Sequence, residues 1–137
     1  MSEESTTPDL VELARESIET EDLEGALSFY APHAAWDASP WGAGVFEGQA
    51  AVRGFFEDWR SSYSSIERTA EEIRDLGNGV MFAVILQQGR LVGSGASVQL
   101  RYASVIEWID DLIVRNTTYT DLDEARAAAE RLAEERE

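Results

Sequence analysis

A carboxylate between two tryptophans marks the stretch AAWDASPWGAGVFEG, residues 34–48, where Trp36 and Trp41 flank Asp37. Large aromatic side chains remove water from a neighbouring carboxyl group, and this desolvation raises its pKa towards the range of a general base. The stretch therefore predicts an acid–base group at the mouth of an apolar pocket. It fits equally well a structural acid in a well-packed corner, and the choice depends on which way Asp37 faces.

The only histidine, His33, is the other side chain that transfers protons readily at neutral pH. It follows Pro32 at a predicted junction between helix and strand, where an exposed histidine is common. A single histidine brings neither the partners of a catalytic triad nor those of a metal site. We therefore expect His33 to be exposed rather than catalytic.

Missing residue types exclude several other kinds of site. All eleven basic residues are arginine, so the chain has no lysine for a Schiff base or a phosphate-binding loop. It has no cysteine, and therefore neither disulfides nor thiolate chemistry. One histidine cannot make a multi-histidine metal site, and the carboxylates lack the spacing of a calcium loop. We expect no metal and no cofactor.

Composition sets the class of protein. The 137 residues, 44% of them hydrophobic, predict one domain over residues 1–137 whose core needs no disulfides. No apolar run approaches the roughly 20 residues that span a bilayer, and the acidic first residues are unlike a signal peptide. The net charge of −16 opposes binding to nucleic acid or to anionic membranes. The absence of cysteine suits a cytoplasmic protein.

Hydrophobic spacing and turn residues predict the helices that must position these side chains. Residues 1–7 are expected to be disordered, and a first helix begins at Thr7, an N-cap residue followed by proline. A second, short helix reaches Tyr30 and is ended by Pro32. Apolar side chains spaced i, i+3, i+4, i+7 predict a third helix over residues 52–63.

Strands dominate after residue 64, and a last helix closes the chain. Asn78 followed by Gly79 is a strong signal for a β-hairpin, and Asp121 with Glu124 makes a capping box for a helix over residues 121–137. Three helices interleaved with short strands, a four-stranded antiparallel meander and a helix make an α+β order. The expected strands cover residues 33–38, 45–48, 66–75, 80–87, 98–109 and 112–119.

The chain resembles the nuclear transport factor 2-like superfamily in four ordered segments, GALSFYAPHAAWDASP, FEGQAAVRGFFEDW, SVIEWIDDLIVRNTTY and TDLDEARAAAE. It is most similar to the SnoaL-like, polyketide-cyclase-like branch, over residues 9–129. The resemblance implies a strongly curved, mostly antiparallel mixed sheet wrapped around the N-terminal helices as a cone, a roll also called cystatin-like. It further implies an apolar pocket at the open end of the cone and a homodimer. The fold alone does not choose a reaction.

The family's catalytic residues find no match in this chain. Aligned without gaps at YAPHAAWDAS, the oxyanion-binding tyrosine of the steroid isomerases falls on Ala14 and their general base on Ala38. Their second oxyanion donor, and the histidine of the SnoaL-like cyclases, falls near Ser104. The resemblance therefore argues against an isomerase or epoxide hydrolase of the familiar kinds. The epoxide-hydrolase groups map to Trp36, Ala38, Val84, Leu86 and Thr118.

Strand parity bears on the role of Asp37. Successive side chains of a strand point to opposite faces, so Asp37 faces outward if Trp36 and Ala38 face the interior of the cone. Arg53, one helix on, is then expected to pair with Asp37 and join strand to helix. The catalytic alternative places Asp37 at the strand end, where Pro40 turns the chain and the carboxylate reaches the pocket rim.

Two arginines of the predicted meander are expected in structural pairs on the outer face. Arg101 and Arg115 would pair there with acids such as Glu107. Exposed pairs of this kind contribute roughly 0–1 kcal/mol to stability, so they predict no functional site.

Bulky apolar side chains, with a few hydroxyl and amide groups among them, are expected to line the pocket. This mixture fits a small hydrophobic molecule oriented by one or two hydrogen bonds; alternatively, the same side chains fill the cone and leave no cavity. Three functions stay open: an enzyme of the cyclase, isomerase or dehydratase type acting through Asp37, a non-catalytic binding protein, and an interaction module whose sheet face makes a homodimer. The expected lining residues are Trp36, Trp41, Phe56, Ser104, Ile106, Trp108, Asn116 and Thr118.

Overall fold

A six-stranded mixed sheet and four helices form the α+β fold that the sequence predicts. The computed structural model describes residues 9–20 and 22–136, so the expected disorder of residues 1–7 lies outside the described residues. The strands lie in the order β2-β1-β6-β5-β4-β3, and neighbours are antiparallel except β1 and β6, which are parallel. The elements are α1 (Leu10–Glu19), α2 (Leu23–Leu27), β1 (Tyr30–Asp37), the 3₁₀ turn η1 (Ser39–Trp41), β2 (Val45–Glu47), α3 (Gln49–Ser61), β3 (Tyr63–Asp75), β4 (Val80–Leu91), β5 (Ser97–Ile109), β6 (Leu112–Tyr119) and α4 (Leu122–Glu135).

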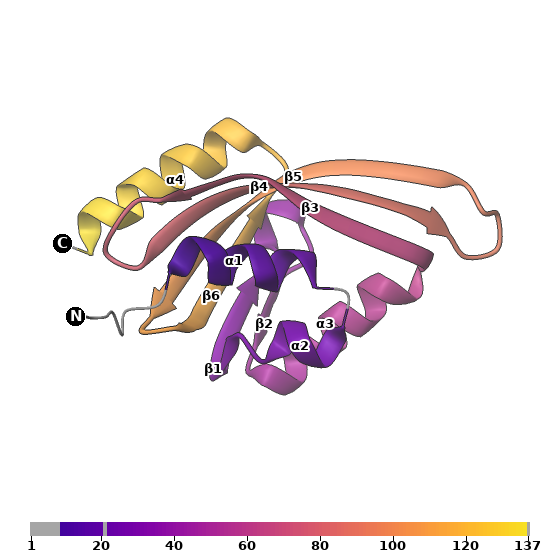
Figure 1. Cartoon of the computed structure of the whole chain (residues 1–137), viewed down its shortest axis with the longest axis horizontal. Helices are drawn as coiled ribbons and strands as arrows, with labels where there is room; N and C mark the ends of the chain where they lie inside the picture. The colour runs from indigo at the N-terminus through magenta and orange to yellow at the C-terminus, as the bar shows by residue number, and fades with distance from the viewer. Residues whose placement is uncertain (1–8, 21, 137) are drawn as a thin grey trace, which may run out of the picture.

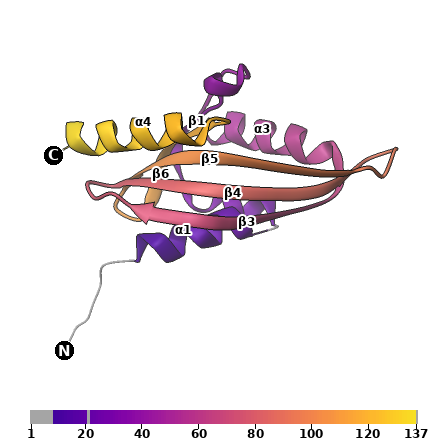
Figure 2. The same ribbon diagram turned by 90° about the horizontal axis from the view of Figure 1, so that it is seen from above.

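The sheet bends strongly, and its two faces are covered by different helices. Figure 1 shows α4 on one face and α1, α2 and α3 on the other, concave side. In Figure 2 the β4–β5 hairpin reaches beyond the helices, at the end away from the C-terminus. Val80, Phe82 and Val84 alternate along β4 and pack under Ala125 and Ala129 of α4. Because the intervening side chains of β4 face the concave side, this strand is buried on both faces, as its apolar sequence predicts.

The concave side of the sheet and the three N-terminal helices enclose one cluster of buried side chains, which we call the cone core. Alternate residues of the central strands point into it, and α1 and α3 close it with their apolar faces. The pocket that the sequence predicts would lie here. The cone core consists of Ala14, Ile18, Leu27, Tyr30, Ala31, Ala34, Trp36, Ala38, Val52, Phe56, Ala70, Met81, Ala83, Ile85, Tyr102, Ile106, Trp108 and Ile113.

The turn between β3 and β4 is the hairpin that Asn78 and Gly79 predict. These residues have φ angles of 58° and 77°, as the two central positions of a type I′ turn require. Arg136, at the end of α4, donates to the carbonyl oxygens of Gly79 and Trp108 at 3.3 Å each. The last helix therefore holds this turn against β5.

Aspartates cap the first and the last helix. Oδ1 of Asp9 accepts from the backbone N–H of Val11 at 3.1 Å, whereas the predicted cap, Thr7, lies outside the described residues. Oδ1 of Asp121 accepts from the N–H of Glu124 at 3.0 Å, which confirms the predicted N-cap of α4.

Several predicted boundaries are wrong. The third helix ends at Ser61, and Tyr63, which was assigned to that helix, begins β3. The second helix ends at Leu27 and β1 already begins at Tyr30, because the Tyr30 ring is buried in the cone core. Pro32 lies inside β1, within the irregular pairing between Tyr30 and Ala35, where its missing N–H costs no ladder hydrogen bond. The glycine-rich connection is also shorter than expected, since β4 continues to Leu91.

Candidate functional site

Asp37 points away from the cone core. Its Oδ2 accepts from the Arg115 guanidinium at 2.6 Å, and its Oδ1 accepts from the amide and the hydroxyl of Ser39 at 2.9 and 2.5 Å. The parallel register sets Ala35 beside Arg115, and Ala35 shares a face with Asp37 because strand side chains alternate. The direction that strand parity predicts for Asp37 is the one observed.

The partner predicted for Asp37 is wrong. Arg53 binds both carboxylate oxygens of Glu24, one of them at 2.9 Å, and Arg115 pairs with Asp37 instead. The cause is the sheet order, because β6 lies in register next to β1. The ion pair therefore joins two strands rather than a strand and a helix.

The hydrogen bonds around Asp37 set its acidity. Partial burial raises the pKa of the carboxyl group, but the two hydrogen bonds from Ser39 and the ion pair with Arg115 together lower the pKa by more, so it lies below the ordinary value. A carboxylate that stays ionised and already holds strong donors is a weak proton acceptor. The geometry favours a structural role for Asp37 over that of a general base.

Asp37→Asn is expected to lower the free energy of unfolding at pH 7 by about 1–3 kcal/mol, because the charge that Arg115 and Ser39 bind is lost. A carboxyl group whose folded-state pKa is depressed stabilises the fold above its unfolded pKa, and this contribution disappears as the pH falls through the folded pKa. Urea unfolding should therefore show the difference from wild type shrinking between about pH 5 and pH 2. Asp58→Asn, at an exposed position, is the control. A difference that persists at the acid end would contradict the ion-pair assignment.

Arg101 and Arg115 are both in ion pairs, as predicted, but with acids other than Glu107. Arg101 binds Glu71, with N–O distances of 2.7 and 3.0 Å. Arg115 lies opposite Glu107 in the register but binds Asp37. Glu107 is half-buried, and this burial raises its pKa in spite of the nearby charges of Arg136 and Arg115.

The predicted lining residues on the strands share the concave face of the sheet. Trp36 lies beside Asn116, Asn116 lies opposite Ile106, and Ser104 lies opposite Thr118. Each of these five side chains is 5% exposed or less. Three strands therefore bring a tryptophan, an amide and two hydroxyl groups onto one buried surface.

Aromatic rings occupy the space between this surface and α3. The Trp36 ring centroid lies 4.6 Å from that of Phe56 and 5.4 Å from that of Phe55. Trp41, from η1, packs on Trp59 at 5.0 Å, and both rings are only partly buried. Aromatic pairs prefer such tilted and edge-on arrangements. Trp41 and Trp59 thus mark the edge at which the interior meets solvent.

Seven buried polar atoms on this side of the sheet have no hydrogen-bond partner within the part of the chain that the structure describes. Nδ2 of Asn116 donates to the Tyr30 hydroxyl at 3.1 Å, yet Oδ1 of the same amide is unpaired. Buried polar groups are nearly always hydrogen-bonded, and an unpaired one costs about 1–3 kcal/mol. In native proteins, buried polar atoms without a protein partner are commonly hydrogen-bonded to ordered water. The seven atoms are Trp36 Nε1, Trp41 Nε1, Gln87 Oε1, Ser104 Oγ, Trp108 Nε1, Asn116 Oδ1 and Thr118 Oγ1.

Three residues that the sequence analysis did not single out complete this interior: Tyr30, Tyr102 and Arg68. Burial raises the pKa of Tyr102 to about 12, against the opposing effect of the Arg68 charge, and burial also raises the pKa of Tyr30. The Arg68 guanidinium lies 6.0 Å from the centroid of the Phe56 ring. The alternation along β5 that places Ser104 inside could have identified Tyr102. Tyr30 was missed because its segment was assigned to a helix.

This interior offers hydrogen-bonding groups but no base. The buried polar side chains among residues 9–20 and 22–136 are one hydroxyl each from Ser104 and Thr118 and the amides of Gln87 and Asn116. His33 is exposed, as predicted. A buried phenol with a raised pKa stays protonated at neutral pH, so it donates a hydrogen bond and does not accept a proton.

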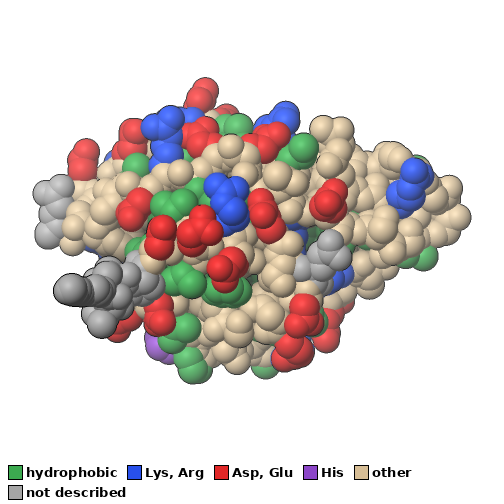
Figure 3. All heavy atoms as spheres, in the orientation of Figure 1, with side chains coloured by type: hydrophobic (Ala, Val, Ile, Leu, Met, Phe, Trp, Pro, Cys, Tyr) green, Lys and Arg blue, Asp and Glu red, His purple; other side chains and the backbone are tan. Residues whose placement is uncertain are grey.

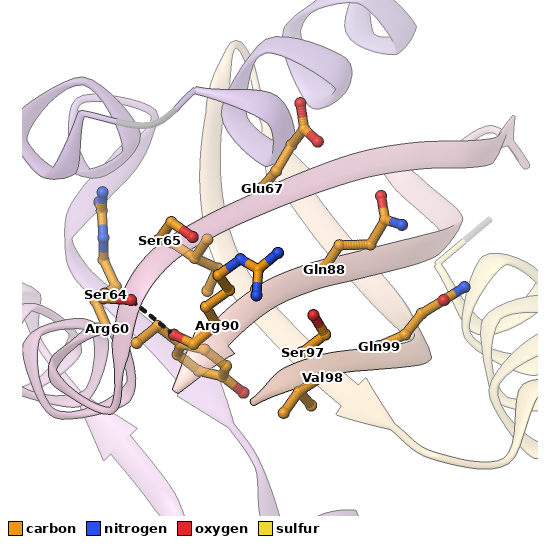
Figure 4. Close-up of a pocket in the computed structure, with 12 residues that line it drawn as sticks. Arg60, Ser64, Ser65, Glu67, Gln88, Arg90, Ser97, Val98 and Gln99 are labelled. Carbon is orange, nitrogen blue, oxygen red and sulfur yellow. Dashed lines mark hydrogen bonds between the residues drawn. The ribbon is translucent and has the colours of Figure 1, made fainter. Parts of the chain in front are cut away.

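A surface pocket of about 870 Å³ lies elsewhere, along the β4–β5 hairpin. Figure 4 shows the side chains of Gln88, Arg90 and Gln99 projecting from neighbouring strands at this pocket. Its lining is mostly polar, and none of the eight predicted site residues takes part in it. The pocket and the cone core are therefore separate candidates.

The surface fits the strong negative charge of the chain. Figure 3 shows acidic side chains spread over the face in view, with few near the hairpin end and hydrophobic groups only in small patches. Among the described residues, no group of three or more metal-binding side chains comes together. No helix in the described ranges combines the length and apolar character needed to cross a membrane.

Comparison with known proteins identifies a matching family model and solved structures of similar fold. The family model described as "SnoaL-like domain" matches residues 11–116, while a comparison with curated proteins finds no match. A hypothetical protein with a ketosteroid isomerase-like fold from Catenulispora acidiphila, solved in complex with trimethylamine, has a TM-score of 0.70 at 14% identity, covering 90% of this chain and 94% of that one. TerC, co-crystallized with polyporic acid, has a TM-score of 0.69 at 16% identity, covering 89% and 98%. A protein from Xanthomonas campestris, provisionally named a polyketide cyclase, has a TM-score of 0.64 at 21% identity, covering 84% and 90%.

Proposed function

The chain belongs to the SnoaL-like domain family, and from this premise we propose that its cone core is the binding site of a small, hydrophobic, aromatic molecule. The lining comprises the eight residues expected from the sequence together with Tyr30, Tyr102 and Arg68. Asp37 and Arg115 brace the sheet behind the site and take no part in chemistry.

One observation carries this proposal: seven unpaired polar atoms lie in the cone core or on the side of the sheet that faces it. Their types alternate between donors, the indole N–H groups of Trp36 and Trp108, and acceptors such as Asn116 Oδ1. A molecule with both a carbonyl and a hydroxyl group satisfies such a set, and its ring stacks against the surrounding aromatic side chains. The edge marked by the partly buried rings of Trp41 and Trp59 is the proposed entry route.

Binding without catalysis fits these side chains better than a reaction that begins with proton abstraction. A neighbour of similar fold is provisionally named a polyketide cyclase, but the described interior brings no carboxylate or imidazole to act as a base. One contact favours a second candidate, electrophilic activation: because Asn116 donates to the Tyr30 oxygen, the Tyr30 proton is left free to donate to a ligand carbonyl. If the protein converted a bound aromatic ketone and Tyr30→Phe abolished this turnover, the function would be catalysis rather than binding alone.

The four tryptophans provide a test, because Trp36, Trp41, Trp59 and Trp108 all belong to the cone core or pack against it. Their indole N–H signals in a ¹H–¹⁵N spectrum report on this site directly. Titration with 2-naphthamide is expected to shift the signals of Trp36 and Trp108 with a Kd of about 1 mM or tighter, the range for a ligand of this size. Four unchanged indole signals would refute the proposal. So would chemical-shift changes limited to the backbone amides of residues that line the surface pocket.

Ser104→Ala and Thr118→Val are expected to separate stability from binding. Each change removes a buried, unpaired hydroxyl, so the free energy of unfolding should stay unchanged or rise, by up to about 1–3 kcal/mol. The affinity for 2-naphthamide should fall in both variants, measured by the same titration. Ser64→Ala is the control, because the Ser64 hydroxyl lies at the surface and donates to the Arg90 carbonyl oxygen. A loss of stability with unchanged affinity would assign the two hydroxyls to the fold instead.

We further propose a homodimer, as the family resemblance implies. The part of the sheet face that α4 leaves uncovered is available for it, although its side chains are mostly polar, as in the Arg101–Glu71 pair. Sedimentation equilibrium gives the mass in solution; a monomer at all concentrations would rule the homodimer out.

A further inference from the structure

Arg68 differs from most arginines of this chain in having no carboxylate partner among the described residues. Six others, on helices and strands alike, lie within 4.0 Å of an acid. Arg90 and Arg136 also lack a carboxylate partner there, but both donate to backbone carbonyl oxygens, whereas the Arg68 guanidinium lies over an aromatic ring of the cone core. The six paired residues are Arg15, Arg53, Arg74, Arg101, Arg115 and Arg126.

The position of Arg68 in β3 directs it towards the cone core. In the register it lies opposite Gln87, a side chain only 2% exposed. Its guanidinium reaches the Phe56 ring, at 6.0 Å from the centroid, and its charge acts on the hydroxyl groups of Tyr30 and Tyr102. Arg68 itself is half-buried.

Two acids close to this part of β3 are engaged elsewhere or face the other way. Glu19 of α1 accepts from the Ala70 amide at 3.1 Å and pairs with Arg15 at 3.6 Å. Glu67 precedes Arg68 in the strand, so it lies on the opposite face. The local surroundings of the Arg68 charge are therefore phenols and an aromatic ring.

A half-buried cation is stabilised by a nearby anion much more than an exposed one, because water screens it less. We propose that the ligand of the cone core carries an anionic oxygen group, a carboxylate or an enolate, that pairs with Arg68. This inference rests on the proposed function and adds to it the charge of the ligand. A guanidinium suits such a group, since its parallel N–H donors match two oxygens.

The matched probes 2-naphthoate and 2-naphthamide test the charge preference, since they differ in little besides the negative charge. Wild type is expected to bind the carboxylate about tenfold more tightly than the amide, by the indole titration described above. The net charge of the protein, −16, works against this preference, so the result requires a local cation. In Arg68→Met the tenfold preference should vanish, so that the ratio of the two dissociation constants approaches one.

Arg90→Met is the matched control, because Arg90 projects from the surface pocket of the same sheet (Figure 4) and should leave the preference intact. Arg68→Lys keeps the positive charge and should retain part of the preference for the carboxylate. Arg68→Gln replaces Arg68→Met in this test if Arg68→Met does not fold. Equal affinities for the two probes in wild type, or a preference that survives in the Arg68 variants, would overturn the inference while the proposed function stands. Failure of both probes to bind would instead overturn the proposed function.

Discussion

Trp36→Ala is expected to lower the free energy of unfolding by about 3–5 kcal/mol, the largest loss from any single truncation of the aromatic cluster. Trp36 is 3% exposed and packs against four aromatic rings. Truncation removes its buried area and leaves a cavity that rings held by β1 and α3 can fill only in part. Urea unfolding followed by far-ultraviolet circular dichroism measures the loss.

Val92→Ala is the control for Trp36→Ala, since Val92 lies at the hairpin tip and is 59% exposed. Its free energy of unfolding should match that of wild type within about 0.5 kcal/mol. An equally small loss in Trp36→Ala would mean that the cone core is open and hydrated around this ring. The packing described for the aromatic cluster would then be wrong.

Gly79→Ala is expected to destabilise the protein by about 2–4 kcal/mol, through two effects that act together. Gly79 has a φ of 77°, which an L-residue with a side chain adopts at a cost. A Cβ atom at this position would also lie 2.6 Å from the Trp108 carbonyl oxygen, which is backbone and cannot move aside. The strain would spread to β5, which carries Trp108 into the cone core.

Gly77→Ala separates the two effects in the same turn. Gly77 has a φ of 85°, but a Cβ atom added there would meet no other atom of the described residues within 4 Å. Gly77→Ala should therefore lower the free energy of unfolding only by the cost of the positive φ angle, about 1–2 kcal/mol. Equal losses for Gly77→Ala and Gly79→Ala in thermal or urea unfolding would show that the contact with Trp108 does not constrain the turn.

Local rules predicted most of the fold. The i, i+3, i+4, i+7 spacing located α3, the pair Asn78-Gly79 located the hairpin, and Asp121 located the start of α4. Each of these signals depends on neighbours in sequence, so the sequence contains all that is needed to read it. Tyr30 is the counterexample: its ring fits a helix face or a strand equally well, and packing against Trp36 and Phe56 decides for the strand.

For the candidate site, the face of the sheet on which a side chain lies was predictable, but the partners in the ion pairs were not. Alternation along β1 gave the directions of Trp36 and Asp37 without any knowledge of the sheet order. The partner of Asp37 depends on which strand lies next to β1, and a residue 78 positions away, Arg115, supplies it. Arg68 was missed because the absence of a carboxylate partner can be recognised only after the acids have been placed in space.

A crystal structure of the protein grown with 2-naphthoate tests the central claim most directly. We expect the naphthalene ring inside the aromatic cluster beside Trp36, its carboxylate paired with Arg68, and Ser104 or Asn116 within hydrogen-bonding distance of the ligand or of a water bound to it. Density for the probe in the surface pocket of the β4–β5 hairpin, with the side chains of the cone core packed against one another and their polar atoms paired within the protein, would contradict it.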